Sequence, residues 1–199
     1  MTNALRTIYF FEDLAHEQFI RGLIRRIAKE KDVKIVEEVL NATRGSRIWI
    51  ELEQFLRDIC NGILSIPDIL IIVIDGNCST AIKVRQAIQQ KVAQAKISIP
   101  YLACAVPNPH IERWYLEDPQ ALRQILPGAE PNCPQYKCEQ DRYKNALKNA
   151  IRKAGLEPSL GGAEYGNDIA QLLDFYTLGK RDNAFKLFVD EVKQAMIHN

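Results

Sequence analysis

Residues 71–74 are all isoleucine or valine, and this run ends on Asp75. β-branched residues favour strands, and a strand that is apolar at every position is covered by other structure on both faces. Such strands are typical of parallel sheets between two layers of helices. Because ligands of open α/β sheets bind beyond the carboxyl ends of the strands, the position of Asp75 predicts a functional edge.

Strand and helix patterns alternate around this run. Strands are predicted over residues 7–11, 34–40, 69–75 and 101–106. Apolar residues at helical spacing predict three intervening helices: one ending near Lys29, one carrying Leu52 and Phe55, and one capped by Ser79 or Thr80. This alternation implies right-handed crossovers and a mostly parallel sheet. We therefore expect an α/β fold in which residues 1–107 form a three-layer core.

The character of the chain changes after Pro107. Six prolines between Pro107 and Pro134 divide this segment into short pieces. Further on, helices are predicted over residues 140–154, 167–178 and 183–197, with a glycine turn at 161–162 and a loop at 179–182. Residues 108–199 are expected to be a helical C-terminal region that packs on the core to give one compact domain.

Composition limits the classes of function. The formal charge is only +1, so a nucleic-acid surface would have to be a local patch. The apolar runs are too short to span a bilayer and the first residues lack a signal-peptide pattern, so a cytoplasmic protein without membrane contact is expected. The five cysteines are an odd number, and no disulfide framework is predicted.

Three further carboxylates can reach the same sheet edge as Asp75. Glu12 follows the first strand, Glu17 lies just over one helical turn further on, and Glu112 follows the fourth strand. Like charges this close raise one another's pKa, and a divalent cation would relieve that cost. Oxygen ligands suit Mg²⁺ or Mn²⁺ better than zinc. Alternatively, each acid only caps a helix or a turn.

Several short motifs are similar to a known family. Residues 11–17 (FEDLAHE), followed by an amphipathic helix, and residues 72–77 (IVIDGN) resemble the Toprim domain of topoisomerases, primases, recombination proteins and overcoming-lysogenization-defect nucleases. That domain has a glutamate after its first strand and an Asp-x-Asp pair after its third. Residues 111–119 (IERWYLEDP) and 183–188 (NAFKLF) resemble segments of small, stand-alone Toprim-like bacterial proteins, some encoded beside ATPases in anti-phage systems.

The resemblance implies a role for each matching residue. Glu12 would be the general acid/base or a metal-ordering carboxylate, Asp75 the principal Mg²⁺ ligand, and Glu112 would complete the ligand shell. Two positions depart from the family pattern. Asp13 replaces the usual glycine, and Asn77 replaces the second aspartate of Asp-x-Asp. An amide oxygen can still coordinate Mg²⁺, but it brings no charge.

The resemblance therefore implies an Mg²⁺- or Mn²⁺-dependent nuclease that cuts DNA or RNA. It also implies control by a partner ATPase of the structural-maintenance or ABC-like class in an anti-phage system, and it leaves a homo-oligomer open. A catalytically degenerate binding or assembly subunit of such a complex is the main alternative. A hydrolase of small phosphate compounds is a third, although the Gly-x-x-x-x-Gly-Lys loop is absent from the sequence.

Basic residues offer candidate contacts to phosphate. Lys144, Lys148 and Arg152 recur at four-residue spacing and predict a basic stripe on one helix face. Such a stripe can track nucleic acid, or it can be an ordinary solvated surface. Lys180 is predicted in a glycine loop, where it could neutralise the charge of a scissile phosphate. Arg181 is a further candidate for contact with phosphate.

Other chemistry-bearing residues favour structural roles. Cys133 and Cys138 lie near His110 in the proline-rich segment, but no set of four zinc ligands can be assembled. His16 is predicted to be exposed near the start of a helix, although it could act as a proton shuttle. The aromatic pair at residues 114–115 is more typical of a core than of base stacking.

Overall fold

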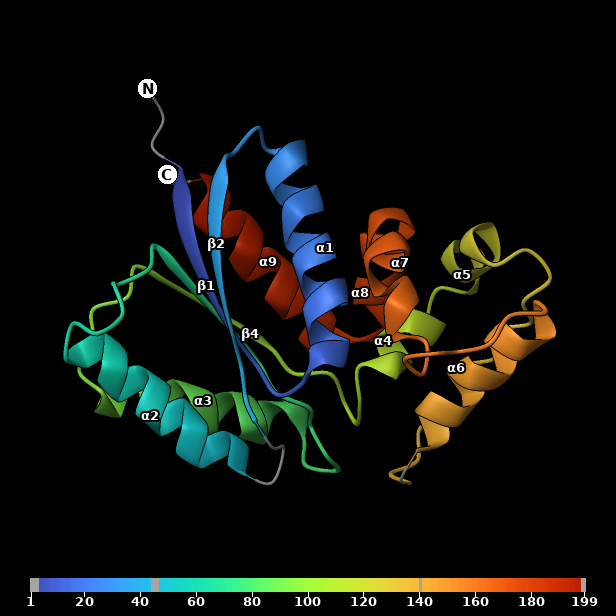
Figure 1. Ribbon diagram of the computed structural model, residues 1–199, viewed down its shortest axis with the longest axis horizontal. Coiled ribbons are helices and arrows are strands. Elements are labelled where there is room, and N and C mark those ends of the chain that lie inside the picture. Colours follow the sequence, from blue (N-terminus) through green and yellow to red (C-terminus); the bar gives the residue numbers. More distant parts are fainter. Residues whose placement is uncertain (1–3, 44–46, 140, 198–199) are drawn as a thin grey trace.

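The computed structural model describes residues 4–43, 47–139 and 141–197 (Figure 1). Its four strands form one sheet in the order β2-β1-β3-β4, and every neighbouring pair is parallel. The prediction of an α/β fold with a parallel sheet is therefore confirmed. The strands are β1 (Leu5–Phe11), β2 (Ile35–Asn41), β3 (Ile69–Val73) and β4 (Tyr101–Ala105).

Alternate residues of β3 face two separate apolar layers. Ile69, Ile71 and Val73 lie in the layer that includes α1 (Leu14–Glu30) and α9 (Asn183–Ile197). Leu70 and Ile72 lie in the layer formed with α2 (Ile48–Cys60) and α3 (Ala81–Gln94) on the opposite face (Figure 1). Both faces of the central strand are thus buried, which explains why its sequence is apolar at every position.

Short helices occupy much of the chain after β4, and no strand follows it among the described residues. They are α4 (Glu112–Leu116), α5 (Pro119–Ile125), α6 (Arg142–Lys153), the 3₁₀ helix η2 (Ala163–Tyr165), α7 (Gly166–Leu172) and α8 (Phe175–Arg181). The predicted helix over 140–154 matches α6, but residue 140 lies outside the described part. Within the described ranges, no helix has the length and apolar character needed to cross a membrane.

The single helix expected over residues 167–178 is a wrong prediction. The chain forms α7 and α8 instead, because the Asp174 carboxylate accepts the backbone N–H groups of Tyr176 and Thr177 and begins a new helix there. The loop expected at 179–182 is consequently helical as far as Arg181.

Trp114 connects the C-terminal region to the α/β core. It is fully buried, and its ring centroid lies 6.4 Å from that of Phe19 in α1 and 5.1 Å from that of Phe185 in α9. Its indole N–H donates to the Asp182 carboxylate at 3.1 Å. Residues of both halves of the chain therefore share one apolar layer, and the aromatic pair at 114–115 belongs to the core.

Side chains from two helices cover the outer edge of β4. The Cys104 N–H donates to the Glu191 carboxylate at 3.1 Å, and the Cys104 carbonyl accepts from Arg85 at 3.2 Å. Arg85 and Glu191 also form an ion pair. This arrangement satisfies backbone groups that would otherwise be open to pairing with another chain.

Glu191→Ala is expected to lower the free energy of unfolding by about 1–3 kcal/mol, because it leaves the Cys104 N–H and the partly buried Arg85 guanidinium without this acceptor. Urea unfolding followed by circular dichroism measures the change. Asp190→Ala is the matched control, since Asp190 pairs with Lys186 on the surface. Equal shifts for the two variants would contradict a special role for Glu191.

Candidate metal centre

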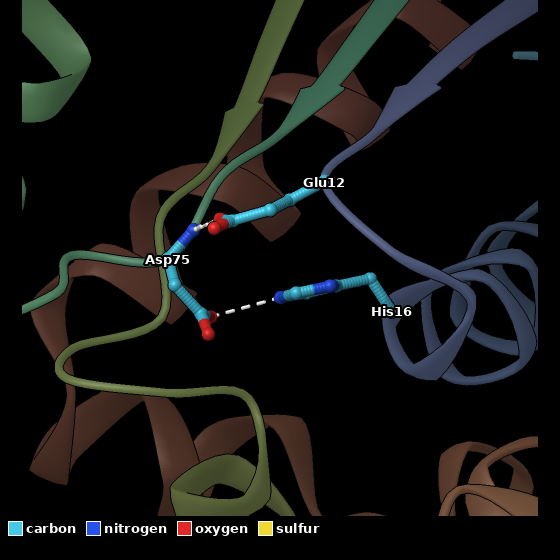
Figure 2. Close-up of side chains that lie close together, drawn as sticks. All are labelled: Glu12, His16 and Asp75. Carbon is cyan, nitrogen blue, oxygen red and sulfur yellow. Dashed lines mark hydrogen bonds and ion pairs between the residues drawn. The ribbon is translucent and has the colours of Figure 1, made fainter. Parts of the chain in front are cut away.

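Glu12 and Asp75 meet at the carboxyl edge of the sheet. They follow β1 and β3, which are neighbours and pair at Phe11 and Val73. The Glu12 carboxylate accepts the Asp75 backbone N–H at 2.8 Å (Figure 2). The structure therefore brings together the two acids that the sequence places after separate strands, as parallel strands require.

His16 lies between two carboxylates and is buried, with 1% of its surface exposed. Its Nε2 is 2.8 Å from Asp75 Oδ1 (Figure 2), and its Nδ1 is 2.8 Å from Asp13 Oδ1. The prediction of an exposed histidine is wrong. Asp13 caps α1 by accepting from the backbone N–H of Ala15 and of His16, and it thereby fixes the first turn with the His16 ring toward the sheet edge.

The two carboxylates determine the charge of His16. Burial lowers the pKa of His16, but the charge of Asp75 and the hydrogen bonds to Asp13 and Asp75 outweigh burial and hold the pKa well above its usual value. Burial raises the pKa of Asp13, yet the contacts with His16 prevail and lower it to about 2. This raised pKa favours the imidazolium form of His16, which supplies positive charge to the edge, and a metal that binds His16 would displace its Nε2 proton.

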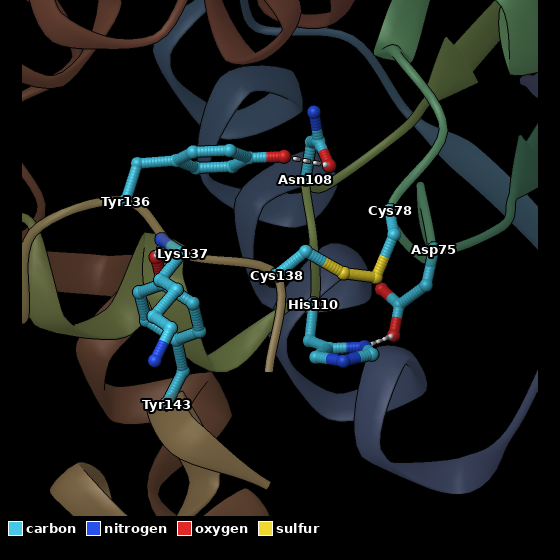
Figure 3. Close-up of a disulfide and its surroundings, with 8 residues drawn as sticks. All are labelled: Asp75, Cys78, Asn108, His110, Tyr136, Lys137, Cys138 and Tyr143. Atoms are coloured by element: carbon cyan, nitrogen blue, oxygen red, sulfur yellow. Dashed lines mark hydrogen bonds and ion pairs between the residues drawn. A yellow bond between two sulfur atoms is a disulfide. The ribbon is translucent and has the colours of Figure 1, made fainter. Parts of the chain in front are cut away.

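A second imidazole contacts the other oxygen of Asp75. His110 Nδ1 lies 3.0 Å from Asp75 Oδ2 (Figure 3), so both carboxylate oxygens of Asp75 face a histidine. The hydrogen bond to Asp75 raises the pKa of His110, although partial burial opposes it. The linear order places His110 near Cys133 and Cys138 and gives no link to Asp75.

The pKa values of Glu12 and Glu112 are raised, whereas that of Asp13 is lowered. Burial raises the pKa of Glu12, and the neighbouring charge of Asp75 adds to the rise, against the hydrogen bond from the Asp75 N–H. Burial and then the charge of Asp75 also raise the pKa of Glu112. Neighbouring groups therefore neutralise only part of the negative charge of these carboxylates. An added cation is favourable under that condition.

The centre opens into a cavity of about 460 Å³. Asp75, Asn77 and Glu112 line it, together with Lys144 from α6. The Asn77 amide nitrogen lies 3.4 Å from Glu12 Oε1. Gly76 is needed in this turn, because a Cβ there would lie 2.8 Å from the side-chain oxygen of Asn108.

The candidate basic residues lie on different sides of the molecule. Lys144 reaches the cavity, Lys148 is half-buried one turn further along α6, and Arg152 is exposed beyond it. Lys180 belongs to α8, and its Nζ lies 4.2 Å from the centroid of the Tyr176 ring in a separate groove. The prediction of Lys180 in a glycine loop is therefore wrong.

Two other candidates also lie away from the cavity. Arg181 donates to the Glu117 carbonyl at 2.8 Å and lines a different pocket. Glu17 is held by Arg21 at 2.6 Å and by the Asn41 amide at 2.9 Å, so it faces away from Asp75. Of the four acids considered from the sequence, Glu12, Asp75 and Glu112 gather at this edge.

The donor atoms fit a divalent cation. Glu12, His16 and Asp75 each offer one ligand atom, and these atoms lie within 4.8 Å of one another. The 2.8 Å contact between His16 Nε2 and Asp75 Oδ1 is a hydrogen bond, so a cation that takes both atoms would displace the proton between them. Asp13 would orient the ligating imidazole, as second-shell carboxylates do.

An imidazole in the donor set changes the expected metal preference. The sequence indicated oxygen ligands alone, but His16 adds a nitrogen, which transition-metal ions including Mn²⁺ accept more readily than Mg²⁺ does. No family model, curated protein or solved structure matches this chain. Functional inference therefore depends on the chemistry of this centre.

Proposed function

We propose that this protein is a metal-dependent phosphodiesterase of Toprim-like type that hydrolyses DNA or RNA. The observation that carries the proposal is the convergence of Glu12, His16 and Asp75 at the carboxyl edge of adjacent parallel strands. The sequence motifs around Glu12, Asp75 and Glu112 support the same class of activity.

Within this proposal each residue has a defined task. Glu12, His16 and Asp75 would hold Mn²⁺ or Mg²⁺, which when bound would polarise a phosphoryl oxygen and acidify a water molecule. Asp13 positions His16 through the Nδ1 contact. Lys144 lies on the cavity wall, where its ammonium can attract a phosphate, so it replaces Lys180 as the candidate for that task.

The wider context is also part of the proposal. Lys148 and Arg152 would extend the phosphate path along α6, and Arg181 would contact nucleic acid only outside the cavity. A cytoplasmic partner ATPase of the structural-maintenance or ABC-like class would control the chain in an anti-phage complex. Support for that partner comes from the motifs at residues 111–119 and 183–188.

A degenerate binding subunit is the second candidate, and a specific observation favours it. Both oxygens of Asp75 already contact imidazoles, and the Asn77 amide lies beside Glu12. Protonated His16 can therefore balance the acidic edge without any metal. On this alternative the site is a structural relic that keeps the fold and has lost the cation.

Nucleic-acid cleavage distinguishes the two candidates. We expect the purified protein to cut DNA or RNA with Mn²⁺, more slowly with Mg²⁺, and not with EDTA. Glu12→Gln and Asp75→Asn should each lower the rate at least about a hundredfold, as loss of a metal ligand does. Glu17→Gln is the matched control and should retain activity, because Glu17 pairs with Arg21 outside the cavity.

The assay includes single- and double-stranded DNA and RNA, alone and with a neighbouring ATPase if the gene has one. Calorimetry with Mn²⁺ supplies an independent readout. Absence of both cleavage and Mn²⁺ binding would refute the enzyme and leave the binding subunit. Cleavage that persists in Asp75→Asn would refute this centre as its source.

A further inference from the structure

A disulfide lies on the wall of the candidate metal centre. It joins Cys78 to Cys138 across 60 residues, with 5.4 Å between the two Cα atoms (Figure 3). Cys78 comes three residues after Asp75, and both cysteines line the cavity that also contains Asp75 and His110. The prediction of no disulfide framework is corrected by this one pair, and Cys138 is thereby withdrawn from the set considered for zinc.

The pair is open to solvent. Cys78 and Cys138 are both exposed, whereas Cys104 is buried in the core. Thiol–disulfide exchange requires in-line access of a thiolate to a sulfur atom, and exposed disulfides are accordingly the labile ones. Access alone therefore permits small thiols to open and close this bond.

The backbone around Cys78 is held in an unusual conformation. Asn77 and Cys78 have φ angles of +43° and +72°, a region that non-glycine residues adopt at a cost of roughly 1–2 kcal/mol per residue. Asparagine tolerates this region through its short polar side chain, but cysteine has no such advantage. The covalent link to Cys138 therefore helps to hold the turn that follows Asp75.

The other side of the bond is weakly attached. Residues 135–139 are all exposed and have no regular secondary structure. The Tyr136 hydroxyl lies 3.4 Å from Asn108, and the Lys137 N–H lies 3.3 Å from the Tyr143 hydroxyl (Figure 3). Two further contacts are made by exposed side chains of the segment: Arg113 lies 5.5 Å from the Tyr136 ring centroid, and Arg142 pairs with Glu139 at 3.0 Å. Such a segment buries little apolar surface, so the disulfide contributes much of what keeps it against the cavity.

We propose that Cys78 and Cys138 form a reversible redox latch that fastens residues 135–139 to the wall of the candidate metal centre. Oxidation closes this side of the cavity, and reduction releases the segment and widens access to Asp75 and His110. As a control on nucleic-acid hydrolysis, the latch rests on the proposed function, but its chemistry can be tested without it.

The exchange reaction balances with a small-molecule disulfide, such as oxidised glutathione, as the oxidant. The thiolate of one cysteine attacks a sulfur of the small disulfide, which forms a mixed disulfide and releases one small thiolate. The second cysteine thiolate attacks the protein sulfur of that mixed disulfide and releases the second small thiolate. Two protein thiols are oxidised, one small disulfide is reduced, and the two thiol protons pass to the released thiolates.

The test is differential alkylation and hydrogen exchange of the full chain in glutathione buffers of graded potential. Peptide mass analysis should show Cys78 and Cys138 changing together from disulfide to alkylated thiols. Amide exchange of residues 135–139 should then rise about tenfold on reduction. Cys78→Ser and Cys138→Ser should show the fast exchange at every potential, and Cys60→Ser should behave as wild type, since Cys60 lies on α2.

Two results would overturn the latch: alkylation of both cysteines in the most oxidising buffer, or a disulfide whose reduction leaves the exchange of 135–139 unchanged. Pairing of either cysteine with Cys133 would also refute it. Cleavage of nucleic acid should be faster in the reduced protein. If cleavage is absent in every buffer while the alkylation and exchange results hold, the proposed function fails and the latch stands.

Discussion

His16→Ala is expected to lower the free energy of unfolding by about 3–5 kcal/mol and to abolish Mn²⁺ binding. His16 is buried between Asp13 and Asp75 at 2.8 Å from each. Removing the imidazole leaves the largely buried Asp75 carboxylate with His110 as its remaining imidazole partner, facing a cavity the size of the lost ring. Urea unfolding and calorimetric titration with Mn²⁺ measure the two losses.

Rescue by added imidazole distinguishes the specific loss of the His16 ring from a general packing defect. Free imidazole can refill the space beside Asp75, so it should restore part of the stability of His16→Ala and leave the wild type unchanged. Gln18→Ala is the matched variant on the exposed side of α1 and should stay within about 0.5 kcal/mol of wild type. A loss below about 1 kcal/mol for His16→Ala would contradict the charge-balancing role of the imidazolium.

The sheet and its acidic edge could be predicted because they follow from local pattern and topology. An apolar run with both faces buried requires a parallel sheet with helices on each side, and the structure confirms this fold. Parallel strands end on one edge, so Glu12 and Asp75 had to approach each other once β1 and β3 were neighbours.

The histidines and the disulfide could not be obtained in this way. His110 contacts Asp75 across 35 residues of sequence, and Cys138 contacts Cys78 across 60. The spacing of apolar residues along the chain does not predict contacts between such separated positions. For His16 there was a usable signal: Asp13 lies three residues before it, a spacing that puts both side chains on one face of the first helical turn. The split into α7 and α8 likewise depends on one capping carboxylate, Asp174.

Asn77→Asp tests the position at which the chain departs from the Toprim pattern. The Asn77 amide nitrogen lies 3.4 Å from Glu12 Oε1, so a carboxylate there would repel Glu12. Without metal the variant should lose about 1 kcal/mol of stability. With metal the added charge becomes a ligand, and the Mg²⁺ affinity should rise about tenfold, because affinity follows the number of charged oxygen ligands.

Asn77→Asp should lose stability without metal and gain affinity for Mg²⁺. This combination distinguishes a cation site from a merely acidic surface. Asn41→Asp is the matched control: the Asn41 amide lies 2.9 Å from Glu17 at the end of β2, outside the cavity. It should lose comparable stability, and Mg²⁺ should restore none of it. Thermal unfolding of both variants across a Mg²⁺ titration measures the contrast. If Mg²⁺ stabilises Asn77→Asp no more than Asn41→Asp, the edge does not gather ligands around a cation, and the histidines that contact Asp75 balance its charge.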